Sequence, residues 1–115
     1  PGDLIDKLTM LEVKCGHLAD ATEREAARRE LAELQGVREQ TLKPGDELEK
    51  LAAQLRAVNE TLWRVNEELH SCEGRGDFGA AFIELARTSL RENDRRAALV
   101  RQINECVSSV SHKQH

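Results

Sequence analysis

The stretch DELEKLAAQLRAVNETLWRVNEELHSCE, residues 46–73, decides the fold of this chain. Its apolar residues recur at alternating steps of three and four: Leu48, Leu51, Leu55, Val58, Leu62, Val65, Leu69 and Cys72. This a/d heptad pattern is typical of a helix that packs lengthwise against another helix. At 1.5 Å of rise per residue the helix is roughly 40 Å long, too long for a small globule to surround. It therefore needs a partner along most of its length.

That partner follows in the sequence after a glycine-containing turn at residues 74–77. We predict a second long helix over residues 78–110, with these inward residues: Phe82, Ala86, Leu90, Asn93, Ala97, Val100, Ile103, Val107 and Val110. In a hairpin with a short loop, facing positions have a constant sum of residue numbers. Leu48 with Ile103 and Val58 with Asn93 give sums of 151, and the other predicted pairs give 151 or 152. The matching register predicts an antiparallel coiled-coil hairpin.

Two shorter helices precede the hairpin. The first is predicted over residues 3–19 with Asp3 as its cap, an inward stripe and an exposed face. The stripe is Leu4, Leu8, Leu11, Cys15 and Leu18, and the exposed face carries Asp6, Lys7 and Glu12. The second is predicted over residues 23–40, with a capping box from Thr22 to Glu25. Its inward stripe is Ala27, Leu31 and Leu34.

The remaining boundaries follow from turn residues. Lys43, Pro44 and Gly45 break the chain, and Asp46 is expected to cap the first long helix. Residues 111–115 lack an apolar pattern and are expected to fray. We therefore predict one all-α domain over residues 1–115, a helical bundle in which the two shorter helices flank the hairpin.

Composition excludes several classes of protein. Of the 115 residues 39% are hydrophobic but only 3% aromatic, which favours a core of Leu, Val, Ile and Ala between helices. The net charge of -4 argues against a nucleic-acid partner. No apolar run reaches 18 residues and no leader pattern is visible, so we expect neither a membrane span nor export. The three scattered cysteines, Cys15, Cys72 and Cys106, form no CxxC pair; we expect buried thiols in a reducing cytoplasm, with no metal or cofactor.

A polar stripe beside the apolar seam is the candidate site. On the first long helix it comprises Arg56, Asn59, Trp63, Asn66, His70 and Glu73. On the second, Arg87, Asp94 and Arg101 repeat every seven residues and are expected to face it, with Asn93 opposite Val58. One interpretation is structural, because a buried Asn fixes helix register. The other is a pocket with Trp63 as a wall, the two arginines as anion ligands and Asp94 as an orienting carboxylate.

Known helical enzymes match the chain poorly. Glu67 and His70 form a single Glu-x-x-His, whereas di-iron bundles need two. Glu67-Glu68 is followed by Ser71 where helical nucleotide pyrophosphohydrolases carry a third Glu. Scattered Arg residues leave open a small helical chorismate mutase. The sequence thus does not decide whether the chain is an enzyme.

Three stretches are similar to an uncharacterised bacterial family catalogued as a domain of unknown function. They are residues 1–14 (PGDLIDKLTMLEVK), residues 58–63 (VNETLW) with the segment to Glu73, and residues 82–87 (FIELAR) with Asn93–Ala97 and Ile103-Asn104. The resemblance implies that Asp6, Lys7, Asn59, Trp63, Arg87, Asn93, Asp94 and Arg95 are motif residues. It also implies short cytoplasmic modules near glycosyltransferases, pointing to surface-polysaccharide work. Asn66, Leu90 and Val100 depart from the family pattern.

Two functions remain as hypotheses. The first is a non-enzymatic interaction or scaffold module that forms a homo-oligomer or binds a protein partner, because the long helices expose more apolar edge than two short helices cover. The second is a binder of a small anionic molecule, or a small enzyme, that uses the stripe around Trp63, Arg87 and Asp94.

Overall fold

The computed structural model describes residues 1–42 and 45–113, with side chains described up to Ser108. Within these residues the chain forms four helices and no strand, which confirms the all-α prediction. The helices are α1 (Gly2–His17), α2 (Ala21–Thr41), α3 (Asp46–Arg75) and α4 (Ala80–Lys113). The predicted break at Lys43 and Pro44 lies outside the described residues, as do the last two residues of the predicted frayed tail. α4 continues to Lys113, past the predicted end at Val110, whose side chain also lies outside the described part.

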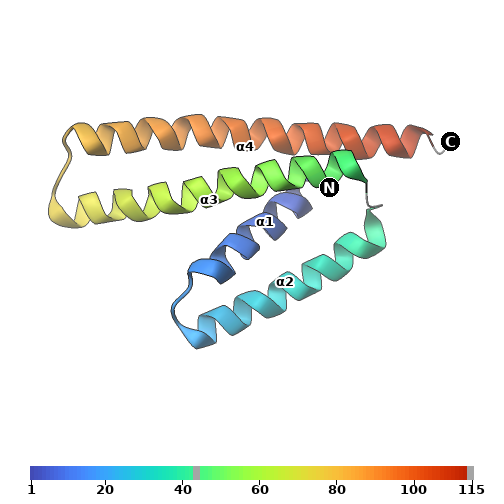
Figure 1. The fold of residues 1–115 in the computed structure, drawn as a ribbon, viewed down its shortest axis with the longest axis horizontal. Coiled ribbons are helices and arrows are strands. Elements are labelled where there is room, and N and C mark those ends of the chain that lie inside the picture. Colours follow the sequence, from blue (N-terminus) through green and yellow to red (C-terminus); the bar gives the residue numbers. More distant parts are fainter. Residues whose placement is uncertain (43–44, 114–115) are drawn as a thin grey trace.

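α3 and α4 form an antiparallel hairpin that runs the length of a molecule measuring 57 × 32 × 16 Å (Figure 1). α1 packs against α2, α3 and α4, on the side of α3 that carries the first half of its seam, and α2 lies outermost against α1. The main core lies where α1 crosses the hairpin. Its buried residues are Ile5, Leu8, Leu48, Leu51, Ala52, Leu55, Val58, Leu62, Leu99 and Ile103.

The heptad seam of α3 is confirmed. Every residue of it is buried except Leu69, which is half-buried. In α2, Ala27 is buried and Leu31 and Leu34 are half-buried, as predicted. In α1 the buried stripe is wider than predicted, because this helix packs against α2, α3 and α4. Gly2, Ile5, Thr9 and Val13 are buried, whereas Leu4, Cys15 and Leu18 are half-buried.

The predicted inward face of α4 is wrong in the middle of the helix, where the inward residues are shifted by about one position. There Leu90, Asn93 and Ala97 are exposed, and the residues turned inward are instead Leu85, Glu92, Arg96 and Leu99. The other predicted inward residues with a described side chain are buried or half-buried, as predicted: Phe82, Ala86, Val100, Ile103 and Val107. One residue is about 100° of helix rotation. Asn93 therefore does not meet Val58; its Nδ2 donates to the carbonyl oxygen of Ser89 in its own helix at 2.9 Å.

Three predicted helix caps are also wrong. α1 begins one residue early, so Asp3 lies in its first turn and makes no cap hydrogen bond. The carboxylate of Asp20, not the Thr22 hydroxyl, caps α2 by accepting from the backbone N–H groups of Thr22 and Glu23. Asp46 lies inside the first turn of α3, whose cap residue is Gly45. α3 ends at Arg75, and the residue that caps it, Gly76, adopts φ 68°, a left-handed conformation that costs glycine little.

The cysteines differ from the expectation of three buried thiols. Cys72 is buried, whereas Cys15 and Cys106 are half-buried, and all three are free. None of the described helices combines the length and apolarity that crossing a bilayer requires.

The start of α1 touches α4 closely at Gly2. Its N–H donates to Asn104 Oδ1 at 2.8 Å, and a Cβ at this position would lie 2.5 Å from the carbonyl oxygen of Val100. Gly2→Ala should therefore lower the free energy of unfolding by about 1–3 kcal/mol, because backbone must move to make room. Gly16 of the same helix has open space around it, and Gly16→Ala should raise that free energy by about 0.5–1 kcal/mol. Urea unfolding followed by circular dichroism measures both, and equal effects would contradict the close contact.

Candidate functional site

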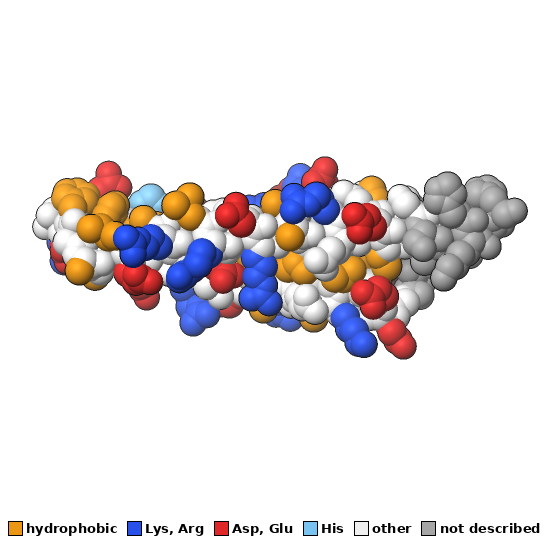
Figure 2. Space-filling model, turned by 90° about the horizontal axis from the view of Figure 1, so that it is seen from above, with side chains coloured by type: hydrophobic (Ala, Val, Ile, Leu, Met, Phe, Trp, Pro, Cys, Tyr) orange, Lys and Arg blue, Asp and Glu red, His pale blue; other side chains and the backbone are white. Residues whose placement is uncertain are grey.

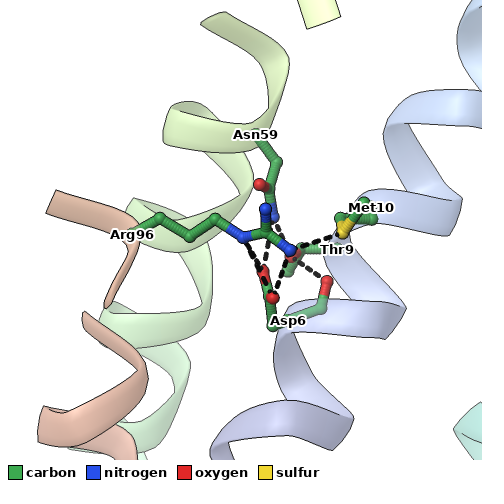
Figure 3. A network of polar contacts seen from close by, with 5 residues as sticks. All are labelled: Asp6, Thr9, Met10, Asn59 and Arg96. Carbon is green, nitrogen blue, oxygen red and sulfur yellow. Dashed lines mark hydrogen bonds and ion pairs between the residues drawn. The ribbon is translucent and has the colours of Figure 1, made fainter. Parts of the chain in front are cut away.

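A buried polar network joins three helices at the centre of the molecule (Figure 3). Asp6 of α1 accepts hydrogen bonds from Arg96 of α4: Arg96 Nε lies 2.9 and 3.0 Å from the two carboxylate oxygens and Nη2 lies 2.6 Å from Oδ2. The side chains are 14% exposed for Asp6 and 29% exposed for Arg96. This forked arrangement is the strongest form of ion pair that proteins use.

Asn59 and Thr9 complete the network from α3 and α1. Both are buried, and Asn59 Nδ2 donates to Asp6 Oδ1 at 3.0 Å and to Thr9 Oγ1 at 2.9 Å. The Thr9 hydroxyl donates in turn to the backbone carbonyl of Asp6 at 2.9 Å. Among the described residues no buried side-chain nitrogen or oxygen lacks a partner. The network therefore fixes α1 on the hairpin without a large desolvation penalty.

A cavity of about 340 Å³ lies beside this network. Its lining comes from all four helices: Lys7, Met10, Leu11, Val13, Lys14, Glu30, Asn59, Leu62, Trp63, Asn66, Asn93 and Arg96. Cavities that bind small molecules usually measure 300–1,000 Å³ and are mostly apolar with a few fixed polar groups. This cavity has that composition and lies at the small end of the range.

The Trp63 indole, which forms one wall of the cavity, also contacts the ring of His17. The two rings stack with centroids 5.3 Å apart and 18° between their planes. His17 Nε2 lies 2.6 Å from Glu60 Oε1, which fixes the imidazole in turn. Trp63 also lines the hollow that contains His17, so the indole contributes to both depressions. The aromatic wall of the cavity is thus positioned by residues of α1 and α3.

The charges around the cavity are mainly positive. Lys7 pairs with Glu30 at 3.5 Å, and both side chains are well exposed. Arg96 is engaged by Asp6, and its Nη2 also lies 2.9 Å from Met10 Sδ. Lys14 is exposed and makes no ion pair with a described residue. Since the whole chain has a net charge of -4, this is a local reversal of its overall charge.

Four of the predicted site residues line this cavity together: Asn59, Trp63, Asn66 and Asn93. Lys7 lines it as well, and Asp6 lies just beneath it in the network. Arg87, Asp94 and Arg101 are exposed and are not among the lining residues, because the rotation of α4 turns them away. Arg95 is also exposed.

Sequence reasoning missed Thr9, Met10, Lys14, Glu30 and Arg96 at this site. It also assigned Asp6 to an exposed face, whereas its carboxylate is the centre of the network. A signal for Arg96 was present, because it belongs to Asn93–Ala97, part of the third stretch on which the family resemblance depends. Residues from all three motif stretches meet in the network: Asp6 from the first, Asn59 from the second and Arg96 from the third.

The fold and the site define an all-α helical bundle with a pre-formed cavity of positive local charge. Among the described residues no group of three His, Cys, Asp or Glu side chains is placed to hold a metal ion. No family model matches the chain, and neither the curated proteins nor the solved structures contain a significant match to it. Any assignment of function therefore depends on the geometry of this molecule.

Proposed function

We propose that this chain is a non-enzymatic helical interaction module that self-associates through the outward face of α4. The observation that supports it is a stripe of six residues at alternating steps of three and four, which we call the α4 stripe: Ile83, Arg87, Leu90, Asp94, Ala97 and Arg101. All six are exposed, and the two large apolar members are 50% exposed at Ile83 and 69% exposed at Leu90. Heptad spacing on a solvated face is typical of a helix that packs against a further helix.

The charges of the α4 stripe favour a second copy of the chain as the partner. Arg87 precedes Leu90 by three residues and Asp94 follows it by four. A two-fold axis near Leu90 would place two α4 helices antiparallel, with the two Leu90 side chains together. Arg87 of each copy would then lie near Asp94 of the other copy, which gives two ion pairs. Such self-complementarity is what a symmetric dimer interface requires.

The unsupported end of the hairpin adds to this argument. α1 ends at His17, which stacks on Trp63, so the later part of α3 and the first part of α4 extend past α1 (Figure 1). Phe78 at this end is 57% exposed and packs edge to face on Phe82, with ring centroids 5.2 Å apart. Figure 2 shows hydrophobic side chains gathered there and charges of both signs along α4. A contiguous apolar surface of this kind marks interaction sites in soluble proteins.

The test measures mass in solution by sedimentation equilibrium over a wide range of concentration. The wild-type chain should show a monomer–dimer equilibrium, and Leu90→Ala should weaken it at least tenfold because two buried leucines are lost. Arg87→Glu and Asp94→Arg should each weaken it by up to about tenfold, since each replaces two attractive pairs by two repulsive ones. The double variant Arg87→Glu/Asp94→Arg should restore the wild-type dissociation constant.

Two results would overturn the proposal. A wild-type chain that stays monomeric at every concentration would exclude self-association. A dimer that is unaffected by all three single variants would place its interface elsewhere.

The cellular location of the module and its partner proteins are proposed from the sequence resemblance alone. The resemblance implies a bacterial protein near glycosyltransferases in the cytoplasm, so partner searches would begin with surface-polysaccharide enzymes. The cavity beside Asp6 is not needed for this function.

A further inference from the structure

We propose that the cavity beside the Asp6–Arg96 network, lined by all four helices, binds a small organic anion that carries an aromatic ring. The proposal is independent of the dimer, because the cavity lies on the α1 side of the hairpin and the α4 stripe does not line it. It differs from the sequence-based hypothesis in its cations, which are Lys14 and Arg96 rather than Arg87 and Arg101.

The negative charge of the ligand is inferred from the lining cations. Lys7, Lys14 and Arg96 surround the cavity, against Glu30 in the lining and Asp6 behind Arg96. Asp6 engages the Nε and Nη2 atoms of the guanidinium, while Nη1 has no hydrogen-bond partner among the described residues. The Lys14 ammonium group is likewise without an ion pair there. These two groups offer donors to a carboxylate or phosphate.

The aromatic part of the ligand is inferred from the apolar wall. Met10, Leu11, Val13 and Leu62 line the cavity together with the Trp63 indole. An aromatic ring packs well against an indole and a thioether, which both favour flat, polarisable partners. An inorganic anion would leave this wall without contacts, and a neutral aromatic molecule would leave Lys14 unused.

The cavity is already organised before any ligand binds. The Arg96 guanidinium is fixed by two carboxylate oxygens, and the Trp63 ring is fixed by the stacked His17. Pre-organised groups lose little conformational entropy on binding, so even a small ligand can gain measurable affinity. The volume of about 340 Å³ is enough for a substituted single ring.

The experiment uses Trp63 as its reporter, because it is the one tryptophan of the chain and gives a single indole N–H signal in a ¹H–¹⁵N spectrum. The probes are phenylacetate, phenyl phosphate and the neutral analogue phenylacetamide. At least one of the two anions should shift the indole signal in a saturable way. Phenylacetamide should bind at least tenfold more weakly than that anion, since it lacks the charge that pairs with the Lys14 ammonium group and accepts from Arg96 Nη1.

Two variants separate this site from general attraction of anions. Lys14→Gln should weaken binding of the anion about tenfold and leave the melting temperature unchanged, because Lys14 is exposed. Lys50→Gln is the matched control: Lys50 is also exposed, carries the same charge and lies outside the cavity lining, so it should leave binding unchanged. The absence of a saturable shift with both anions, equal binding of phenylacetamide, or equal losses in the two variants would each overturn the proposal.

Discussion

Leu55→Ala should lower the free energy of unfolding by about 3–5 kcal/mol, whereas Leu90→Ala should lower it by less than about 0.5 kcal/mol. Leu55 is fully buried in the core between α1, α3 and α4, and its loss leaves a cavity that rigid helices cannot close. Leu90 is 69% exposed, so the same truncation removes few contacts within one chain. Urea unfolding followed by circular dichroism, at a concentration below the dimer dissociation constant, measures both values.

The pair of variants also decides the orientation of α4. The sequence predicts that Leu90 faces α3, and in that case the two substitutions would have similar costs. A loss above about 2 kcal/mol at Leu90 in the monomer would contradict the rotation described here.

Asp6→Ala should lower the free energy of unfolding by about 2–3 kcal/mol, which is the second large effect. The change removes the two carboxylate oxygens that accept hydrogen bonds from the Arg96 guanidinium. It also removes one acceptor of the buried Asn59 amide. Truncating one member of a partly buried ion pair is costly because the other charge loses its partner. The partial exposure of Arg96 keeps the effect below the largest values measured for fully buried pairs.

A double-mutant cycle with Arg96→Ala isolates the interaction itself. The coupling energy should be about 1–3 kcal/mol, as is usual for directly contacting residues in one network. The adjacent exposed pair Lys7–Glu30 is the control, and Lys7→Ala should change stability by no more than about 0.5 kcal/mol. A coupling near zero between Asp6 and Arg96 would show that the network does not hold α1 in place.

The number and order of helices could be predicted from the sequence because each has a clear apolar period and strong breaks. The seam of α3 is unambiguous, since Leu48 to Cys72 are separated almost everywhere by polar residues. Helix ends were predicted to within about two or three residues, as is normal for local signals. The caps were less certain because several Asp, Thr and Gly residues compete at each end.

The face of α4 could not be predicted because its apolar residues do not form a single stripe. Leu85 lies beside Ala86 and Leu99 beside Val100 in the sequence, so two neighbouring faces have similar hydrophobicity. A constant sum of residue numbers sets the register along the hairpin but not the rotation of each helix. The observed rotation places Arg96 against Asp6 of α1, a contact that the hairpin alone does not contain.

Only the part of the site that lies on α3 could be predicted from the sequence. Asn59, Trp63 and Asn66 belong to one stripe of α3, and their neighbourhood follows from helical spacing alone. The hydrogen-bond partners of Asn59 on α1 are Asp6 and Thr9, which lie about 50 residues away in sequence. No local sequence pattern links such positions. A polar residue beside an apolar stripe, such as Asp6, is usually solvated, so its burial becomes evident only when three helices are assembled.

The contacts of α1 determine the order in which the chain can assemble. Asp6 and Arg96 are 90 positions apart, and Gly2 and Asn104 are 102 positions apart. A ribosome makes α1 before α4, so the anchoring partners of α1 appear only after 90 or more further residues have been made. Contacts of such long sequence separation form late and slow folding. α1 is therefore fixed only after α4 has been made, and this helical bundle becomes stable only once nearly all of α4 is present.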